Sequence, residues 1–119
     1  MKPKQAIISF SQSEKVKSGL IWCSQCVQIA QNLSQAEQTG AVKLVQSLVA
    51  MISNEAQLAR QAGGDEAWLE VEKALNTARV MVDSGVIQEA TYHFTQALSQ
   101  VNRVGQKAMT HLVDQGLFT

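Results

Sequence analysis

The sequence has little charge. Only 17% of its 119 residues are charged, whereas about a quarter are charged in a typical globular domain. Ten basic and ten acidic residues leave a formal net charge of zero, so the chain lacks the positive surface on which nucleic-acid binding depends. A local excess of lysine remains near the N-terminus, where Lys2, Lys4, Lys15 and Lys17 accompany only Glu14. We interpret these lysines as a solvated segment, with phosphate binding as the less favoured interpretation.

Long apolar runs are also missing. A membrane-spanning helix needs about 20 consecutive apolar residues, and no run in the chain approaches that length. The run at residues 6–10 is too short for the core of a signal peptide. Two cysteines are too few for a disulfide scaffold and fit a reducing compartment. These features predict a cytoplasmic protein with no membrane association.

The patterns of common active sites are absent from the sequence. There is no glycine-rich phosphate loop, no strand–turn–helix elbow to present a serine, and no Glu-x-x-His pair of the kind found in di-iron bundles. His93 and His111 are separated by 18 residues, which is about 27 Å along one continuous helix, so they cannot bind the same metal ion. We therefore expect no enzymatic activity, no metal and no cofactor.

The chain does contain a strong helical rhythm, with apolar residues recurring at alternating steps of three and four. This rhythm and its breaks predict helices near 12–33, 38–62, 65–84 and 86–115. Short connections favour antiparallel neighbours, so we expect residues 1–119 to form one domain, an up-down-up-down four-helix bundle. Pro3 and the apolar residues Ile7, Ile8 and Phe10 predict that residues 1–10 form a short extended arm.

Two of the predicted helices carry more apolar residues than one narrow stripe holds. The first has two adjacent stripes, one with Val16, Leu20, Cys23, Val27 and Ala30, the other with Ile21, Trp22, Cys26, Ile29 and Leu33. The stripe of the second includes Ala41, Leu44, Val45, Leu48, Met51, Ile52, Glu55, Leu58, Ala59 and Ala62. We expect both stripes of the first helix to form a wide core face. Cys23 and Cys26 should be reduced, mostly buried and slow to react, because they lie far from the helix N-terminus.

Glu55 is the most unusual member of these stripes. A buried carboxylate without a partner is costly, so Glu55 should be paired, protonated or at the edge of the core. Arg79, Arg103 or a histidine could pair with it. We favour a structural pairing or exposure at a helix end, and a contact with a ligand or partner is the alternative.

The sequence thus predicts a non-enzymatic helical-bundle interaction protein that acts as an adaptor, chaperone or assembly subunit. Its partner is another protein or a second copy, and a homodimer is favoured because Ile21, Trp22, Val42 and Val49 lie off the main stripes and because the arm and the 117–118 tail are apolar. The alternative is a bundle with an internal polar, metal or ligand site around Glu55, Cys23 and Cys26, or His93. The candidate residues for a partner contact or polar site are Glu55, His93, Trp22 and Phe10.

Overall fold

The computed structural model of the protein describes residues 2–117 and consists of four helices. They are α1 (Pro3–Gln31), α2 (Gln35–Gly63), α3 (Ala67–Asp83) and α4 (Ile87–Asp114). No strand occurs within the described residues, so the predicted all-helical fold is confirmed. Over the same residues, no helix combines the length and the apolar content that crossing a membrane requires.

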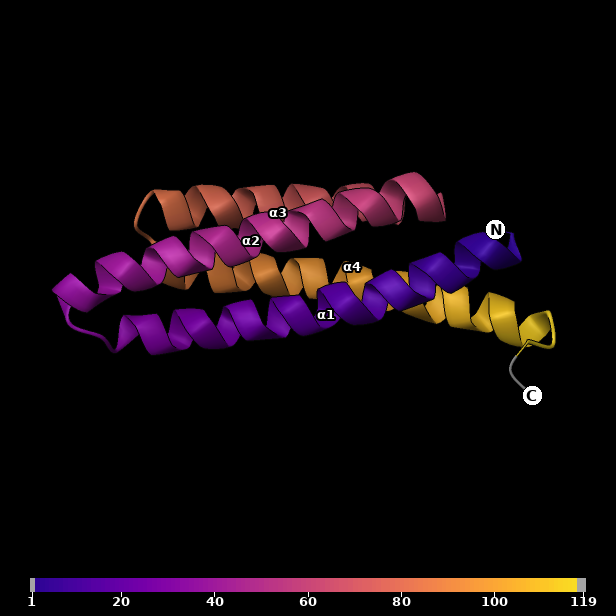
Figure 1. The fold of residues 1–119 in the computed structure, drawn as a ribbon, viewed down its shortest axis with the longest axis horizontal. Helices are drawn as coiled ribbons and strands as arrows, with labels where there is room; N and C mark the ends of the chain where they lie inside the picture. The colour runs from indigo at the N-terminus through magenta and orange to yellow at the C-terminus, as the bar shows by residue number, and fades with distance from the viewer. Residues whose placement is uncertain (1, 118–119) are drawn as a thin grey trace.

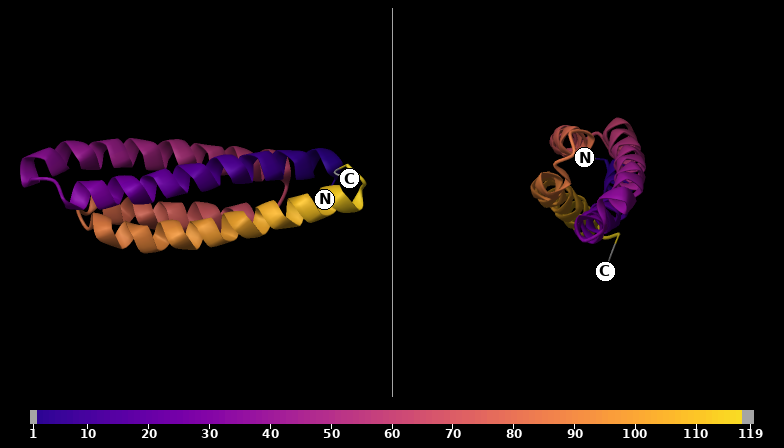
Figure 2. Two further views of the ribbon diagram at one scale, coloured as in Figure 1. Left: turned by 90° about the horizontal axis from the view of Figure 1, so that it is seen from below. Right: turned by 90° about the vertical axis from the view of Figure 1, so that its left-hand side faces the viewer.

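The helices form a four-membered ring in which α1 and α3 each pack against both α2 and α4 (Figure 2). Successive helices run in opposite directions (Figure 1). Two hydrogen bonds agree with this: Gln38 at the start of α2 donates to the carbonyl of Ala30 at the end of α1, and Gln12 near the start of α1 donates to Glu55 far along α2. The molecule is the up-down-up-down bundle that the short connections predict.

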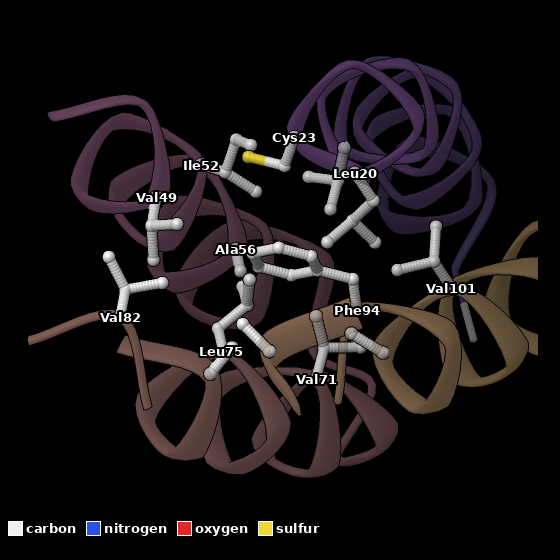
Figure 3. Packing of buried hydrophobic residues seen from close by; sticks show 14 of the residues in the cluster. Leu20, Cys23, Val49, Ile52, Ala56, Val71, Leu75, Val82, Phe94 and Val101 are labelled. Atoms are coloured by element: carbon white, nitrogen blue, oxygen red, sulfur yellow. The ribbon is translucent and has the colours of Figure 1, made fainter. Parts of the chain in front are cut away.

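The buried residues of each helix follow a heptad repeat, with alternating steps of three and four. On α1 they include Ala6, Ser9, Ser13, Val16, Leu20, Cys23, Val27 and Ala30. A 3.5-residue period keeps one narrow stripe on the axis of a bundle, as in a coiled coil. Most of these side chains are small, and Phe94 of α4 fills the centre, where it meets side chains from the other three helices (Figure 3).

Polar side chains define the turns of the bundle. Ser34 and Glu37 form a capping box, in which each side chain accepts a hydrogen bond from the backbone N–H of the other residue. Gly64 ends α2 with a φ of 72°, a left-handed conformation that glycine adopts without strain. Asp65 then accepts a hydrogen bond from the N–H of Ala67 at 2.9 Å, which satisfies one free donor at the start of α3.

The predicted extended arm is wrong, because residues 3–10 form the first turns of α1. Pro3 occupies the first helical position, where its missing N–H is no loss and its fixed φ suits the helix. The side chain of Gln5 accepts a hydrogen bond from the N–H of Lys2 at 3.0 Å. Ala6 and Ser9 continue the buried heptad stripe, so tertiary packing extends the helix to its proline.

The two ends of the bundle are thinner than its middle because α3 has only 17 residues, whereas the other helices have 28 or 29. The turn between α1 and α2 projects beyond α3 and α4, and the start of α1 projects with the end of α4 at the opposite end (Figure 1). Ala6, Ala108 and Leu112 make a small separate core in this second projection, with Phe10 packed against it. Leu117 of the predicted apolar tail is exposed, and Phe118 lies outside the described residues.

The close approach of α1 and α4 generates a stability prediction at Gly105. A Cβ atom at this position would lie 2.7 Å from the side-chain oxygen of Ser13, so Gly105→Val should destabilise the fold by about 1–3 kcal/mol through overpacking. Gly40 is the matched control, since a Cβ there meets nothing within 4 Å. Gly40→Ala should stabilise by roughly 0.8 kcal/mol, because alanine favours a helix interior more than glycine does. Urea unfolding measures both changes, and equal effects would contradict the packing at Gly105.

Candidate functional site: an apolar face on α1 and α2

The outer surface of α1 and α2 carries a second heptad stripe beside the buried one. On α2 the buried residues are Val45, Val49, Ile52, Ala56, Ala59 and Gly63. One position before most of these lie the residues of the outer stripe, which are Ala41, Leu44, Leu48, Met51, Glu55, Leu58 and Ala62. The predicted core stripe of α2 therefore mixed two stripes. Leu44, Met51 and Leu58 are exposed, and Val49, which was placed off the main stripes, is fully buried.

The first helix, α1, also has an exposed apolar stripe next to its buried one. The predicted stripe from Val16 to Ala30 is buried as expected, but the adjacent stripe does not belong to the core. Trp22 and Ile29 are 59% and 63% exposed, and Ile21 and Cys26 are exposed too. We call the two outer stripes together the α1–α2 face, and its apolar members are Ile8, Trp22, Cys26, Ile29, Leu33, Ala41, Leu44, Leu48, Met51, Leu58 and Ala62.

The face is hollowed at two places between the helices. One groove of about 290 Å³ lies toward the α1–α2 turn and is lined only by apolar side chains and Cys26; its walls are Cys26, Ile29, Ala30, Leu33, Ala41, Leu44, Val45 and Leu48. A second groove of about 310 Å³ lies toward the start of α1, where Ile7, Ile8, Leu58 and Ala62 surround Gln12 and Glu55. Leu44 beside the first groove is 74% exposed. The groove between α3 and α4 contrasts with both, because it is lined mainly by polar side chains.

Glu55 lines the second groove and is paired. One of its carboxylate oxygens accepts a hydrogen bond from Gln12 at 2.9 Å, and the other lies 3.0 Å from the ammonium group of Lys15. The hydrogen bond from Gln12, followed by the contacts with Lys15, holds the pKa of Glu55 below its ordinary value. Pairing at the edge of the core was predicted, but the proposed partners Arg79, Arg103 and histidine were wrong. The true partners come from α1, because antiparallel packing places its first half beside Glu55.

Of the other candidate residues, only Trp22 shares the α1–α2 face with Glu55. His93 lies on the opposite side of the ring, in the polar groove between α3 and α4, with its ring edge-on to Tyr92. Phe10 lines the groove between α1 and α4. Trp22 belongs to the α1–α2 face. Within residues 2–117, no three His, Cys, Asp or Glu side chains gather closely enough to hold a metal ion.

The lysines near the N-terminus do not form one free basic patch. Lys15 pairs with Glu55, and Lys17 lies 3.0 Å from Glu14. Two of the four cations thus face carboxylates, which reduces the positive potential available to a phosphate backbone.

Four buried polar atoms, two of them at or next to the α2–α3 turn, were missed by sequence reasoning. Ser9 Oγ, Trp68 Nε1 and His111 Nε2 are buried without a hydrogen-bond partner among the described residues. Asp65 Oδ2 lacks one too, although Lys107 Nζ lies 3.5 Å from it. Ser9, Asp65 and His111 are the residue types of a hydrolytic triad, but no hydrogen bond joins them within residues 2–117. The only sequence signal for these atoms was a serine at a core heptad position.

The environment of Glu55 generates a prediction for its titration. Gln12→Met removes the hydrogen bond that does most to lower the pKa of Glu55, and Lys15→Met removes both a hydrogen bond and a neighbouring positive charge, so each substitution should raise this pKa. Carbon-detected NMR of the Glu55 carboxyl group during a pH titration measures both shifts. An unchanged pKa in either variant would contradict the contact between that residue and the carboxylate.

The lowered pKa also makes folding stability depend on pH through Glu55. A carboxyl whose pKa is lower in the folded state stabilises the protein above its unfolded pKa, and this contribution is lost as pH falls through the folded pKa. The difference in unfolding free energy between the wild type and Glu55→Gln should therefore shrink between pH 7 and about pH 3. A constant difference over that range would contradict the pairing.

The two cysteines should react at very different rates. Cys23 is buried, and its burial, with a smaller contribution from Cys26, raises the pKa of its thiol from 9.0 to about 12. Cys26 is exposed beside the apolar groove, so the prediction that both are mostly buried is wrong for this residue. A thiol reagent should label one cysteine rapidly in the native protein and both in denaturant. Cys26→Ser should abolish the rapid phase, and a rapid phase that persists would place Cys23 at the surface.

Comparison with known proteins yields no relative: no family model matches the chain, and no curated protein and no solved structure matches it. The most distinctive feature of the chain's own surface is the α1–α2 face.

Proposed function

We propose that the protein is a non-enzymatic interaction protein, an adaptor, chaperone or assembly subunit that binds a protein partner or a second copy through the α1–α2 face. One observation supports this above all others. The face repeats the heptad spacing of the core but carries larger side chains at its exposed positions, including Trp22, Leu44, Met51 and Leu58. Large contiguous apolar surfaces are rare on monomers and mark interaction sites.

The spacing of the face favours a helical partner surface. Apolar residues at alternating steps of three and four present ridges and grooves into which another helix packs. The core stripe of the same helices is used in this way within the chain. The cytoplasm is the compartment we propose, because Cys23 and Cys26 are both free thiols, although they are close enough to influence each other.

A photo-crosslinking amino acid in place of Leu44 tests this function in the cells that make the protein. It should capture a protein, either another chain or a second copy, because Leu44 lines the apolar groove of this face and is 74% exposed. The same amino acid in place of Gln96, which lines the polar α3–α4 groove, is the matched control and should capture nothing in comparable yield. Capture from neither position, or equally from both, would refute the α1–α2 face as the interaction surface.

A further inference from the structure

The α1–α2 face is complementary to itself at three levels along its length. In one groove Ile8 of α1 lies with Leu58 of α2, and in the other, apolar groove Ile29 lies with Leu44. Closer to the middle of α1 than Ile8, the cation of Lys15 lies beside the anion of Glu55, which lines the first of these grooves. At each level, then, the residue on α1 is the type that the residue on α2 would contact favourably.

We propose, building on the interaction function above, that the occupant of this face is a second copy of the chain. In this dimer a two-fold axis runs parallel to the helices, so α1 of each copy packs on α2 of the other. Because rotation about this axis does not change a residue's height along the helices, each level of one copy contacts the same level of the other. Ile8 faces Leu58 of the second copy, Ile29 faces Leu44 of the second copy, and Lys15 faces Glu55 of the second copy. The four helices α1, α2 and their symmetry mates form a second four-helix bundle between the two original ones.

Charge selects this axis over the other possible two-fold axis. An axis perpendicular to the helices, through the middle of the face, would turn one copy end for end. It would still bring the two apolar ends together, but it would place Lys15 and Glu55 opposite the level of Trp22. Trp22 would then offer the ammonium group of Lys15 a cation–π contact, but the carboxylate of Glu55 would be desolvated without gaining a partner. The parallel axis instead gives both charges a second opposite charge, and the face as a whole adds no net repulsion.

The size of the face also fits a second copy. Residues 8–33 of α1 span about 38 Å, and two adjacent helices are about 20 Å wide. The product is about 760 Å², close to the roughly 800 Å² per partner of a stable protein–protein interface. One docked helix about 10 Å wide would cover about half of this surface. A two-helix layer is the partner that covers it, and α1 with α2 of a second copy is such a layer.

Sedimentation equilibrium tests whether the copies associate. The wild-type protein should reach a mass of twice 13.0 kDa as its concentration rises. Leu44→Glu should raise the dissociation constant of the dimer by roughly 30-fold or more, because it places a charge in the entirely apolar groove where Ile29 and Leu44 of the two copies meet. Val80→Glu is the matched control, since Val80 is a 53% exposed apolar residue on α3, and it should leave the constant unchanged. Circular dichroism verifies that both variants remain helical.

Cross-linking between two different variants tests the axis. In a Cys26→Ser background, Ile29→Cys chains are mixed with Leu44→Cys chains and treated with a short bis-maleimide. A covalent dimer should form, because the parallel axis places these positions together and the mixture excludes cross-links within one chain. Ile29→Cys mixed with Ile8→Cys should yield little product. A preference for this second pair would overturn the parallel axis.

The outcomes separate this inference from the proposed function. A strictly monomeric wild type that is photo-crosslinked to another protein from position 44 would refute the second copy as occupant and leave the interaction function standing. A monomer that captures nothing from that position would refute both. A dimer that Leu44→Glu and Val80→Glu weaken equally would place the interface elsewhere on the bundle.

Discussion

The heptad spacing of small side chains is the constraint on which the bundle depends. Alanine, serine, glycine and valine occupy many of the buried positions, so the helices approach closely and few large side chains are needed to fill the centre. Phe94 and Trp68 are the largest of the buried side chains, and a few leucines and isoleucines complete the core. Close packing of this kind penalises added volume, which explains why glycine stands at places such as Gly105, where α4 meets Ser13 of α1.

The fold could be predicted from sequence because this repeat is strong and the connections are short. The prediction failed where two physical signals compete. Pro3 usually interrupts a helix, yet it is favourable at the first helical position, and only the packing of Ala6 and Ser9 shows that the helix extends to it. On α2 the two stripes are one residue apart and both are apolar, so periodicity alone could not choose between them. Size does choose: the inner stripe has Ala56, Ala59 and Gly63 where close approach is needed.

The candidate site was predicted only in part for a related reason. Glu55 was recognised because a carboxylate interrupts an apolar stripe, but its partners depend on the register between α1 and α2, which local sequence does not specify. Gln12 and Lys15 belong to an undistinguished polar stretch until the antiparallel packing places them beside Glu55. The exposure of Trp22, Cys26 and Leu44 likewise follows from which stripe faces the axis.

The short α3 has a consequence for dynamics. Where α1 and α2 project beyond it, each helix is supported by one neighbour instead of two, so fewer apolar contacts oppose local opening there than in the middle of the bundle. The apolar groove at Ile29 and Leu44 extends toward this projection, because Leu33 and Ala41 beside the α1–α2 turn belong to its walls. A partner bound to that groove would supply the missing neighbour and suppress the opening. The projecting ends of α1 and α2 would lose conformational entropy when they become ordered, and this loss would offset part of the partner's binding free energy. Binding of a partner to the face would therefore be coupled to the rigidity of the α1–α2 turn.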